Sequence, residues 1–335
     1  MSNVLFSSLG RSPGVVTGTV DALVRAGYSV SEVVTFSTAD LVVQDGSVKL
    51  LRYEFDTYYE GKIAYADYGV AVEDLLTPAD NLVFANLVAS YLVSYRKQGR
   101  HVIISLAGGR KTMSAAMALM AQLFGARMLC HVLVSPTLER MGSIRADQLI
   151  KDAIPRLSRE LRPTLHPEEA DLVVLPFVSL FPALSGVMAV LKGQQAPIAP
   201  DVATMLRESH LVNANGEVTA AGRELLELLE QVEMLPEPTS LRPDEKEIKL
   251  PSHHGVAELQ PLAEKLVQSP FVVAVRSTAY RPYTGRAYEV DEQGNITCSL
   301  MKTDARYSLY VKTTAVTKGQ GQRVADILQL DRLLR

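Results

Sequence analysis

Residues 108–112, Gly-Gly-Arg-Lys-Thr, place two glycines, two cations and a hydroxyl in five consecutive positions. Glycines let backbone N–H groups approach an oxyanion closely and cations neutralise its charge, so the stretch is suited to binding phosphate. It differs from the nucleoside-triphosphate loop, in which Gly stands directly before Lys-Ser/Thr, because Arg110 occupies that place. The stretch therefore predicts a phosphate site of another kind.

A second stretch with the same chemistry lies near the N-terminus, where residues 7–14 read Ser-Ser-Leu-Gly-Arg-Ser-Pro-Gly. Both stretches follow apolar runs, and ligands of parallel sheets bind outside the carboxyl ends of the strands. We therefore expect one anion site made by two loops. The alternative is that the glycines only allow tight turns from strand to helix. The candidate anion-binding residues are Ser8, Gly10, Arg11 and Ser12 in the first loop, and Gly108, Gly109, Arg110, Lys111 and Thr112 in the second.

The elements that must position these loops alternate along residues 1–190. Strands that are apolar on both faces and separated by helices indicate a parallel sheet covered on both sides, which is a Rossmann-like α/β fold. Dinucleotide binding is disfavoured, because no Gly-x-Gly-x-x-Gly follows the first strand and no acidic residue ends the second. The expected strands are 4–6, 33–36, 101–105 and 128–134, and the expected helices are 13–26, 78–98 and 111–124.

The pattern changes after residue 190. Residues 191–236 predict a winged helix-turn-helix, because a helix over 201–211 and a helix over 220–232 flank a turn and a short strand. Residues 237–252 are rich in proline and charge and predict a linker. No strand is obvious in that stretch.

Residues 253–335 predict a small α+β domain. Its expected helices are 256–268 and 322–330, and its expected strands are 271–280, 286–290 and 295–316, the last broken near Asp304. A period of two places Arg306, Tyr310 and Lys312 on one face of the last strand. The preceding segment adds Arg276, Tyr280 and Arg286. A basic, tyrosine-bearing face without a cluster of His or carboxylate residues favours RNA over metal chemistry, and the alternative is an ordinary solvated face.

Composition narrows the class of protein. The net charge of −3 over 335 residues gives no general attraction to nucleic acid, so any such surface must be local. The two cysteines lie far apart in apolar runs, which is typical of reduced cysteines. The N-terminus lacks a basic signal region and the apolar runs are short, so we expect a cytoplasmic protein without membrane contact. We also expect no metal site.

The two motifs together resemble the CARF sensor domain of type III CRISPR accessory proteins. They read SLGRSPGVVTGTVDAL at residues 8–23 and SLAGGRKTM at residues 105–113, and the resemblance spans about residues 1–185. It implies a homodimer that binds cyclic oligoadenylate, with cyclic tetra-adenylate as the expected ring, across its two-fold axis. The candidate anion-binding residues of both loops would then cradle phosphates. Some relatives also cleave the ring, and Lys111 and Ser8 would be the candidates for that step.

The order of CARF domain, winged helix and RelE-like domain is similar to that of CRISPR-associated mRNA interferases. The resemblance implies metal-independent endoribonuclease activity on mRNA in the ribosome, in which a ribose 2′-hydroxyl attacks the adjacent phosphate and cations stabilise the charge. Tyr280, Tyr310 or a lysine of lowered pKa would move the proton. The implied electrostatic residues are Arg276, Arg286, Arg306 and Lys312.

Two other functions stay open at this point. One is a transcription regulator built from the sensor and the winged helix, and the other is a ring nuclease that only destroys the messenger. DNA binding is disfavoured because Arg207 is the one cation in the helix expected over 201–211, which also carries Asp201 and Glu208.

Overall fold

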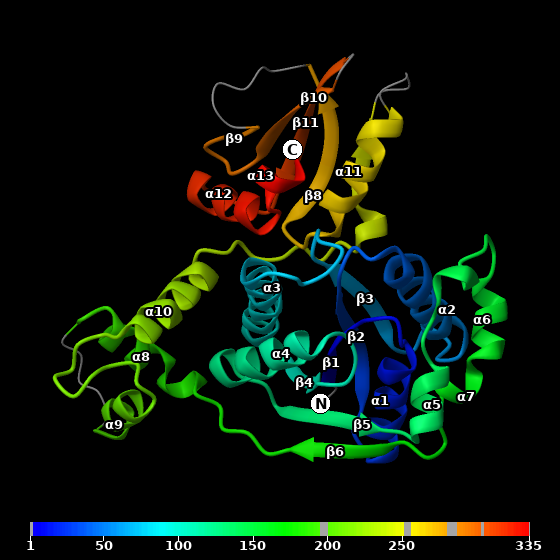
Figure 1. Cartoon of the computed structure of the whole chain (residues 1–335), viewed down its shortest axis with the longest axis horizontal. Helices are drawn as coiled ribbons and strands as arrows, with labels where there is room; N and C mark the ends of the chain where they lie inside the picture. The colour runs from blue at the N-terminus through cyan, green and yellow to red at the C-terminus, as the bar shows by residue number, and fades with distance from the viewer. Residues whose placement is uncertain (1–2, 195–199, 251–255, 280–286, 303–304, 335) are drawn as a thin grey trace.

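The computed structural model describes residues 3–194, 200–250, 256–279, 287–302 and 305–334. Two sheets, each with its own helices, lie one above the other in Figure 1. The larger sheet has the strand order β3-β2-β1-β4-β5-β6, and the smaller sheet has the order β7-β8-β11-β10-β9.

The six-stranded sheet has the parallel character that the sequence predicts. Its first five strands are parallel, and the last runs antiparallel along β5. They are β1 (Asn3–Ser8), β2 (Val30–Ser37), β3 (Ala64–Gly69), β4 (His101–Ser105), β5 (Met128–Leu133) and β6 (Asp171–Leu175).

Helices cover both faces of this sheet. α1 (Gly14–Arg25) and α2 (Lys49–Thr57) pack on one face, and α3 (Pro78–Lys97) and α4 (Lys111–Phe124) pack on the other. Because side chains alternate along a strand, Val4 and Phe6 join the core under α3 and α4 while Leu5 joins the core under α1 and α2. The mixed α/β fold with a parallel-rich sheet is thereby confirmed.

The sequence analysis missed the elements between residues 43 and 69. The chain there forms a π-helix (Val43–Val48), α2 and β3. The sequence of β3 does not form an uninterrupted apolar run, because Asp67, which is buried, lies in its middle. Thr35 and Ser37 on the neighbouring β2 each donate a 2.6 Å hydrogen bond to its carboxylate, and burial raises the pKa of Asp67 to about 6. The polar strand is therefore stabilised by its neighbour.

Residues 136–191 contain short helices on two sides of the sheet (Figure 1). They are α5 (Pro136–Met141), α6 (Ile154–Glu160), α7 (Arg162–Leu165) and α8 (Leu184–Leu191), with 3₁₀ turns at Ala146–Gln148 and Phe181–Ala183. α5, α6 and α7 lie beside α1 and α2, while α8 lies beyond β6 next to α10 (Ala220–Glu233). A buried histidine fastens the side with α5, α6 and α7: His166 bonds to Asp21 of α1 and to Glu54 of α2, at 2.8 and 2.9 Å.

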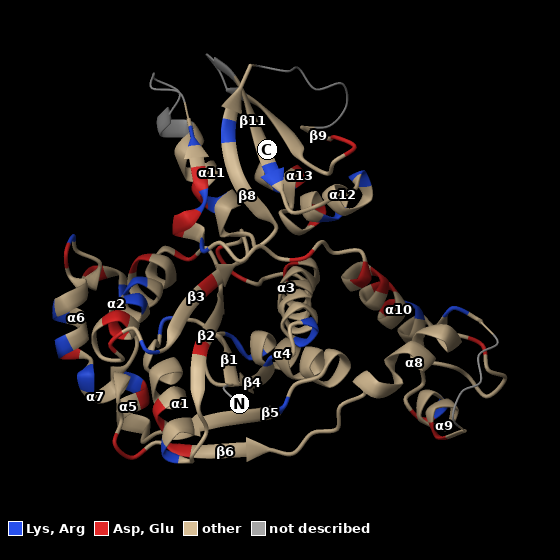
Figure 2. Ribbon diagram, turned by 180° about the vertical axis from the view of Figure 1, so that it is seen from behind, with Lys and Arg blue, Asp and Glu red and all other residues tan. Residues whose placement is uncertain are grey.

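The segment predicted as a winged helix contains α9 (Pro200–Glu208) and α10 (Ala220–Glu233). A single antiparallel bridge between Val212 and Val218 closes the turn between them. The assignment to a winged helix stays a prediction. Figure 2 shows acidic residues in red along the ribbon of α10, which carries Glu224, Glu227, Glu230 and Glu233.

The predicted linker, 237–252, is not wholly a linker. It holds a 3₁₀ turn (Pro243–Glu245) and β7 (Glu247–Lys249), which pairs in parallel with β8 (Val272–Thr278). The buried Lys246 fixes this stretch, because its ammonium donates 2.7 Å hydrogen bonds to the carbonyls of Val267 and Ser269. Burial lowers the pKa of Lys246 to about 7. A strand of three residues with two charges has no apolar run that could reveal it.

The rest of the smaller sheet is antiparallel. β11 (Ala305–Thr313) lies between β8 and β10 (Ile296–Lys302), and β9 (Tyr288–Val290) forms the edge. α11 (Val256–Gln268), α12 (Lys318–Ile327) and α13 (Leu330–Leu333) complete this part. Its core contains Val275, Leu309 and Val311 from the strands, with Leu266 of α11 and Val324 of α12.

The two parts of the chain share one core and polar contacts. The hydrophobic cluster around α3 continues into α11, α12 and α13. Asp80 in the first turn of α3, which is fully buried, accepts hydrogen bonds of 3.1 Å from Gln329 and Arg332. Asp80 also accepts a bond from the backbone N–H of Thr77, so the residue that caps α3 is also the contact to α13.

Candidate functional site: a cavity between two loops

The two predicted loops meet at the carboxyl edge of the sheet. β1 and β4 are parallel neighbours, so the chain leaves both strands at the same edge. The Ser8 hydroxyl donates a 2.9 Å hydrogen bond to the carbonyl oxygen of Gly108. Gly10 lies against Gly109 so closely that a Cβ on Gly10 would stand 3.2 Å from the Gly109 Cα atom. The two loops therefore form one structure.

Gly108 and Gly109 have conformations that favour glycine. Their φ angles are +93° and +64°, in the region that L side chains rarely adopt. A Cβ on Gly108 would also stand 2.7 Å from the carbonyl oxygen of Ser8. The two glycines thus allow both the turn and the close approach of the loops. Because α4 begins two residues after Gly109, the free N–H groups of its N-terminus follow the turn directly.

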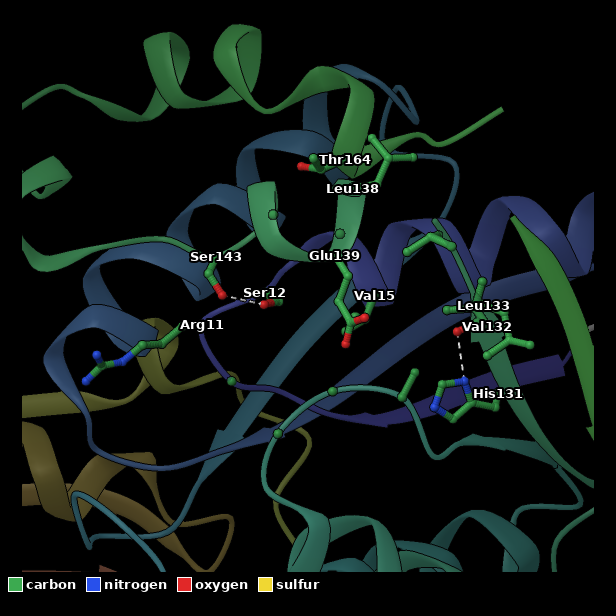
Figure 3. Close-up of a pocket in the computed structure, with 17 residues that line it drawn as sticks. Arg11, Ser12, Val15, His131, Val132, Leu133, Leu138, Glu139, Ser143 and Thr164 are labelled. Carbon is green, nitrogen blue, oxygen red and sulfur yellow. Dashed lines mark hydrogen bonds between the residues drawn. The ribbon is translucent and has the colours of Figure 1, made fainter. Parts of the chain in front are cut away.

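The loops border a cavity of about 360 Å³, which lies within the range of small-molecule sites (Figure 3). Five of the predicted residues line it: Gly10, Arg11, Ser12, Gly108 and Gly109. Ser8 is buried behind the lining, and Arg110, Lys111 and Thr112 are exposed beside it at the start of α4. The fold therefore brings the predicted residues of both loops together at the cavity, but only five of them line it.

Two arginines of the set are held by carboxylates. Arg11 pairs with Asp40 at 2.6 Å, and although burial opposes the shift, the hydrogen bond from Arg11 lowers the pKa of Asp40. Arg110 pairs with Asp74, which lies in the loop between β3 and α3. Lys111 makes no ion pair with any described residue. Its ammonium is therefore the cation of these loops that could bind an anion without first leaving a carboxylate.

The far wall of the cavity was not predicted from the sequence. It comes from the end of β5, from α5 and from the turn after α5, and its polar members are His131, Glu139 and Ser143. The Ser143 hydroxyl bonds to that of Ser12 at 2.8 Å, which connects this wall to the first loop. No motif announces these residues. The antiparallel return of the chain along β6, which encloses this region, follows from topology and not from local pattern.

The predicted catalytic residues of the smaller sheet are only partly described. Tyr280 and Arg286 lie outside the described residues, and Arg306 lies on β11 with its side chain outside them. Arg276 and Tyr310 face each other across β8 and β11, and Lys312 follows on the same face of β11. We call the face with Arg276, Tyr310 and Lys312 the open face, since Arg276 and Lys312 are exposed.

The open face also carries an acidic residue, from the stretch predicted as a linker. Glu247 of β7 bonds to the Arg276 guanidinium, with 2.8 Å between its carboxylate and Nε. Burial, followed by the charge of Asp291, raises the pKa of Tyr310. A tyrosine with a raised pKa is protonated at neutral pH, so it could donate a proton, although it is a weaker acid than an unperturbed tyrosine.

The described residues contain neither a cluster of metal ligands nor a helix that could span a membrane. No group of three or more His, Cys, Asp or Glu side chains is arranged to hold a metal in the described part of the chain. Among the described helices, none is both long enough and apolar enough to cross a bilayer.

The family profile of CRISPR-associated protein NE0113 matches residues 12–210, which is more than half of the chain. The chain belongs to this CRISPR-associated family. The matched range starts within the first loop and contains the second, so the cavity lies inside the family region apart from the residues before Ser12. The search of curated proteins found no match.

Several solved structures are similar at low identity. Csm6 of Enterococcus italicus, bound to cyclic hexa-2′-fluoro-hexa-dAMP, is 15% identical with a TM-score of 0.39, and the match covers 69% of this chain and 54% of Csm6. Can2 of Sulfobacillus thermosulfidooxidans, in complex with cyclic tetra-adenylate, is 10% identical with a TM-score of 0.28 and coverages of 69% and 62%. VC1899 of Vibrio cholerae is 10% identical with a TM-score of 0.31 and coverages of 93% and 77%. The chain thus spans about half the length of Csm6, and TM-scores below 0.5 establish no shared function.

Proposed function

We propose that the protein is a homodimeric sensor of cyclic oligoadenylate, with cyclic tetra-adenylate as the ring, that switches on an endoribonuclease in its C-terminal part. The observation that carries the sensor role is the meeting of the Ser8–Ser12 loop and the Gly108–Thr112 loop around one cavity. Membership of a CRISPR-associated family supports a role in antiviral defence of type III systems.

The chemistry of the cavity suits a ring of phosphates. Glycine N–H groups, the start of α4 and the Lys111 ammonium lie on one side of it, where they would bind phosphate oxygens. A cyclic oligonucleotide distributes its phosphates around a ring, so two copies of this cavity related by a two-fold axis would bind it symmetrically. In this account Arg11 and Arg110 exchange Asp40 and Asp74 for phosphates when the ring binds.

The contact at Asp80 supports communication between the two parts. Asp74 and Asp80 lie six positions apart on either side of the start of α3. The first pairs with Arg110 of the phosphate loop, and the second accepts from Arg332 of the C-terminal part. Withdrawal of Arg110 from Asp74 would therefore act on the segment that carries the contact to α13.

The open face supplies the chemistry of the proposed ribonuclease. The ribose 2′-hydroxyl attacks the adjacent phosphorus, the bond from phosphorus to the 5′-oxygen breaks, and the proton lost from the 2′-hydroxyl is balanced by one gained by the 5′-oxygen. Arg276, Arg306 and Lys312 would stabilise the phosphorane charge, and Tyr310, which is protonated at neutral pH, would donate to the leaving oxygen. The substrate is mRNA in the ribosome, which would supply the remaining positioning.

Mapping of mRNA ends in a translating-ribosome mixture, with and without cyclic tetra-adenylate, tests this proposal. We expect new ends only with the ring, and we expect Arg306→Ala and Lys312→Ala to abolish them. Lys318→Ala, an exposed lysine outside the open face, is the matched control and should cut like the unmodified protein. Intact mRNA in the presence of a bound ring would contradict the ribonuclease role.

A further inference from the structure

A carboxylate faces the proposed phosphate cavity. Glu139 of α5 lines it, and Figure 3 shows its side chain entering from the helix opposite the β1 and β4 loops. Within the described chain the Glu139 carboxylate has neither an ion pair nor a hydrogen bond. An unpaired carboxylate repels a polyanion, so it weakens binding unless the ligand offers it a hydrogen-bond donor.

His131 of β5 provides a second acceptor in the cavity, beside the β4 loop (Figure 3). Its Nδ1 atom lies 2.7 Å from the carbonyl oxygen of Val132, and because a carbonyl only accepts, Nδ1 carries the proton. In the neutral ring Nε2 is then an acceptor. Apolar side chains also line the cavity, and they are Val15, Val132, Leu133, Val134 and Leu138.

The lining of the cavity therefore has two kinds of polar group. The loops offer N–H groups and cations, while Glu139 and His131 offer acceptors, and apolar side chains line the rest. A nucleotide has the matching polarity, because its phosphate is an anion, its base is flat and apolar on its faces, and an exocyclic amine is a donor at the edge of the base.

We propose that Glu139 is a specificity residue that accepts a hydrogen bond from the 6-amino group of an adenine, with His131 as a second acceptor in the same cavity. The proposal rests on the proposed function, since it assigns the base to the site whose phosphate side was described above. It predicts that the amine, and not only the phosphates, is required for tight binding.

Binding of the full chain to two synthetic rings tests this assignment. One is cyclic tetra-adenylate, and the other is the same ring with hydrogen in place of each 6-amino group. We expect the unmodified protein to prefer the adenylate ring about tenfold, as a hydrogen bond to a charged group provides. Glu139→Ala should remove the preference, because it weakens binding of the adenylate ring and tightens binding of the ring without the amine, which no longer meets an unpaired carboxylate. His131→Phe should reduce the preference. Glu169→Ala, an exposed acid away from the cavity, should keep it.

The contrary outcomes are distinct. If Glu139→Ala tightens both rings equally, the carboxylate only repels phosphate, and the assignment is overturned. If Glu139→Ala removes the preference for a ring with 2′-hydroxyls over its 2′-deoxy counterpart instead, the donor is the ribose and the assignment to the base is also overturned. In both cases the rings still bind, so the sensor proposal stands. If neither ring binds the unmodified protein, the sensor proposal itself fails.

Discussion

The Ser8 hydroxyl donates a 2.9 Å hydrogen bond to the carbonyl oxygen of Gly108, and this bond joins two loops that lie 100 residues apart in the sequence. Ser8 is fully buried, so it holds the second loop in place and leaves ligand contact to its neighbours. Removal of the hydroxyl by Ser8→Ala should lower the free energy of unfolding by about 1 kcal/mol. It should also weaken the binding of cyclic tetra-adenylate.

Urea denaturation and calorimetry measure both effects. Ser12→Ala is the control for stability, because its hydroxyl bonds only to Ser143 at an exposed position, and it should change the free energy of unfolding by less than about 0.5 kcal/mol. Equal stability of Ser8→Ala and the unmodified protein would show that the loops do not depend on this bond.

The conformation of Gly108 gives a second prediction. An alanine there combines an unfavourable φ of +93° with a Cβ that would stand 2.7 Å from the Ser8 carbonyl oxygen. We expect Gly108→Ala to cost about 2 kcal/mol or more, measured by thermal denaturation. Gly61→Ala measures the cost of the positive φ alone, since Gly61 has a φ of +66° with nothing within 4 Å, and should cost about 1 kcal/mol. Equal losses would refute the close approach of the loops.

The contact between α3 and α13 allows sensing and cleavage to be separated. Arg332→Met removes the 3.1 Å bond to Asp80 but leaves the bonds from the backbone around Thr77 that cap α3. Ring affinity should therefore change by less than about twofold, while ring-stimulated RNA cleavage should fall severalfold. Lys318→Met, on the same part of the chain but paired with Glu292, should preserve both. Unchanged stimulation in Arg332→Met would exclude this route.

The buried cluster at His166 predicts a dependence of stability on pH. Burial opposes the shift, but hydrogen bonds to Asp21 and Glu54 raise the pKa of His166, and the bond from His166 lowers the pKa of Glu54 despite burial. The histidine contribution is complete below its unfolded pKa of about 6.5 and is lost as the pH rises through the raised folded value. The Glu54 contribution is lost only as the pH falls through its lowered folded value.

The stabilisation by this cluster should thus be greatest between about pH 4.5 and 6.5 and smaller at pH 9. We expect the difference in free energy of unfolding between the unmodified protein and His166→Gln to shrink by about 1 kcal/mol from pH 6 to pH 9. Denaturation across this range measures it, and His210→Gln, an exposed position, should show no such trend. A constant difference for His166→Gln would mean that the imidazole is not charged in the fold.

Local pattern predicted the elements that carry their own signal. The helix over 111–124 and the strand over 101–105 have the predicted bounds, because each is an uninterrupted periodic run between turn residues. The loop chemistry was also readable, since glycines and cations after strands are local features. This is why the residues of both loops could be assigned to one site before the structure.

The missed elements depend on distant partners. β3 is a strand because Thr35 and Ser37 hydrogen-bond to Asp67, and β7 is a strand because β8 lies beside it. The cavity wall with Glu139 belongs to a helix of six residues, too short for a periodic signal. Glu247, which bonds to Arg276, lies in the predicted linker, and its strand β7 is likewise too short to give a periodic signal. Each of these features is set by tertiary contacts.

Titration calorimetry of the full chain with cyclic tetra-adenylate tests the central claim most directly. The account predicts saturable binding of one ring per two chains, with at least tenfold weaker binding in Arg11→Ala and in Lys111→Ala, and no change in Lys62→Ala, an exposed lysine outside the two loops. The account would be contradicted if the unmodified protein did not bind the ring, or if Arg11→Ala and Lys111→Ala bound it as tightly as the unmodified protein does.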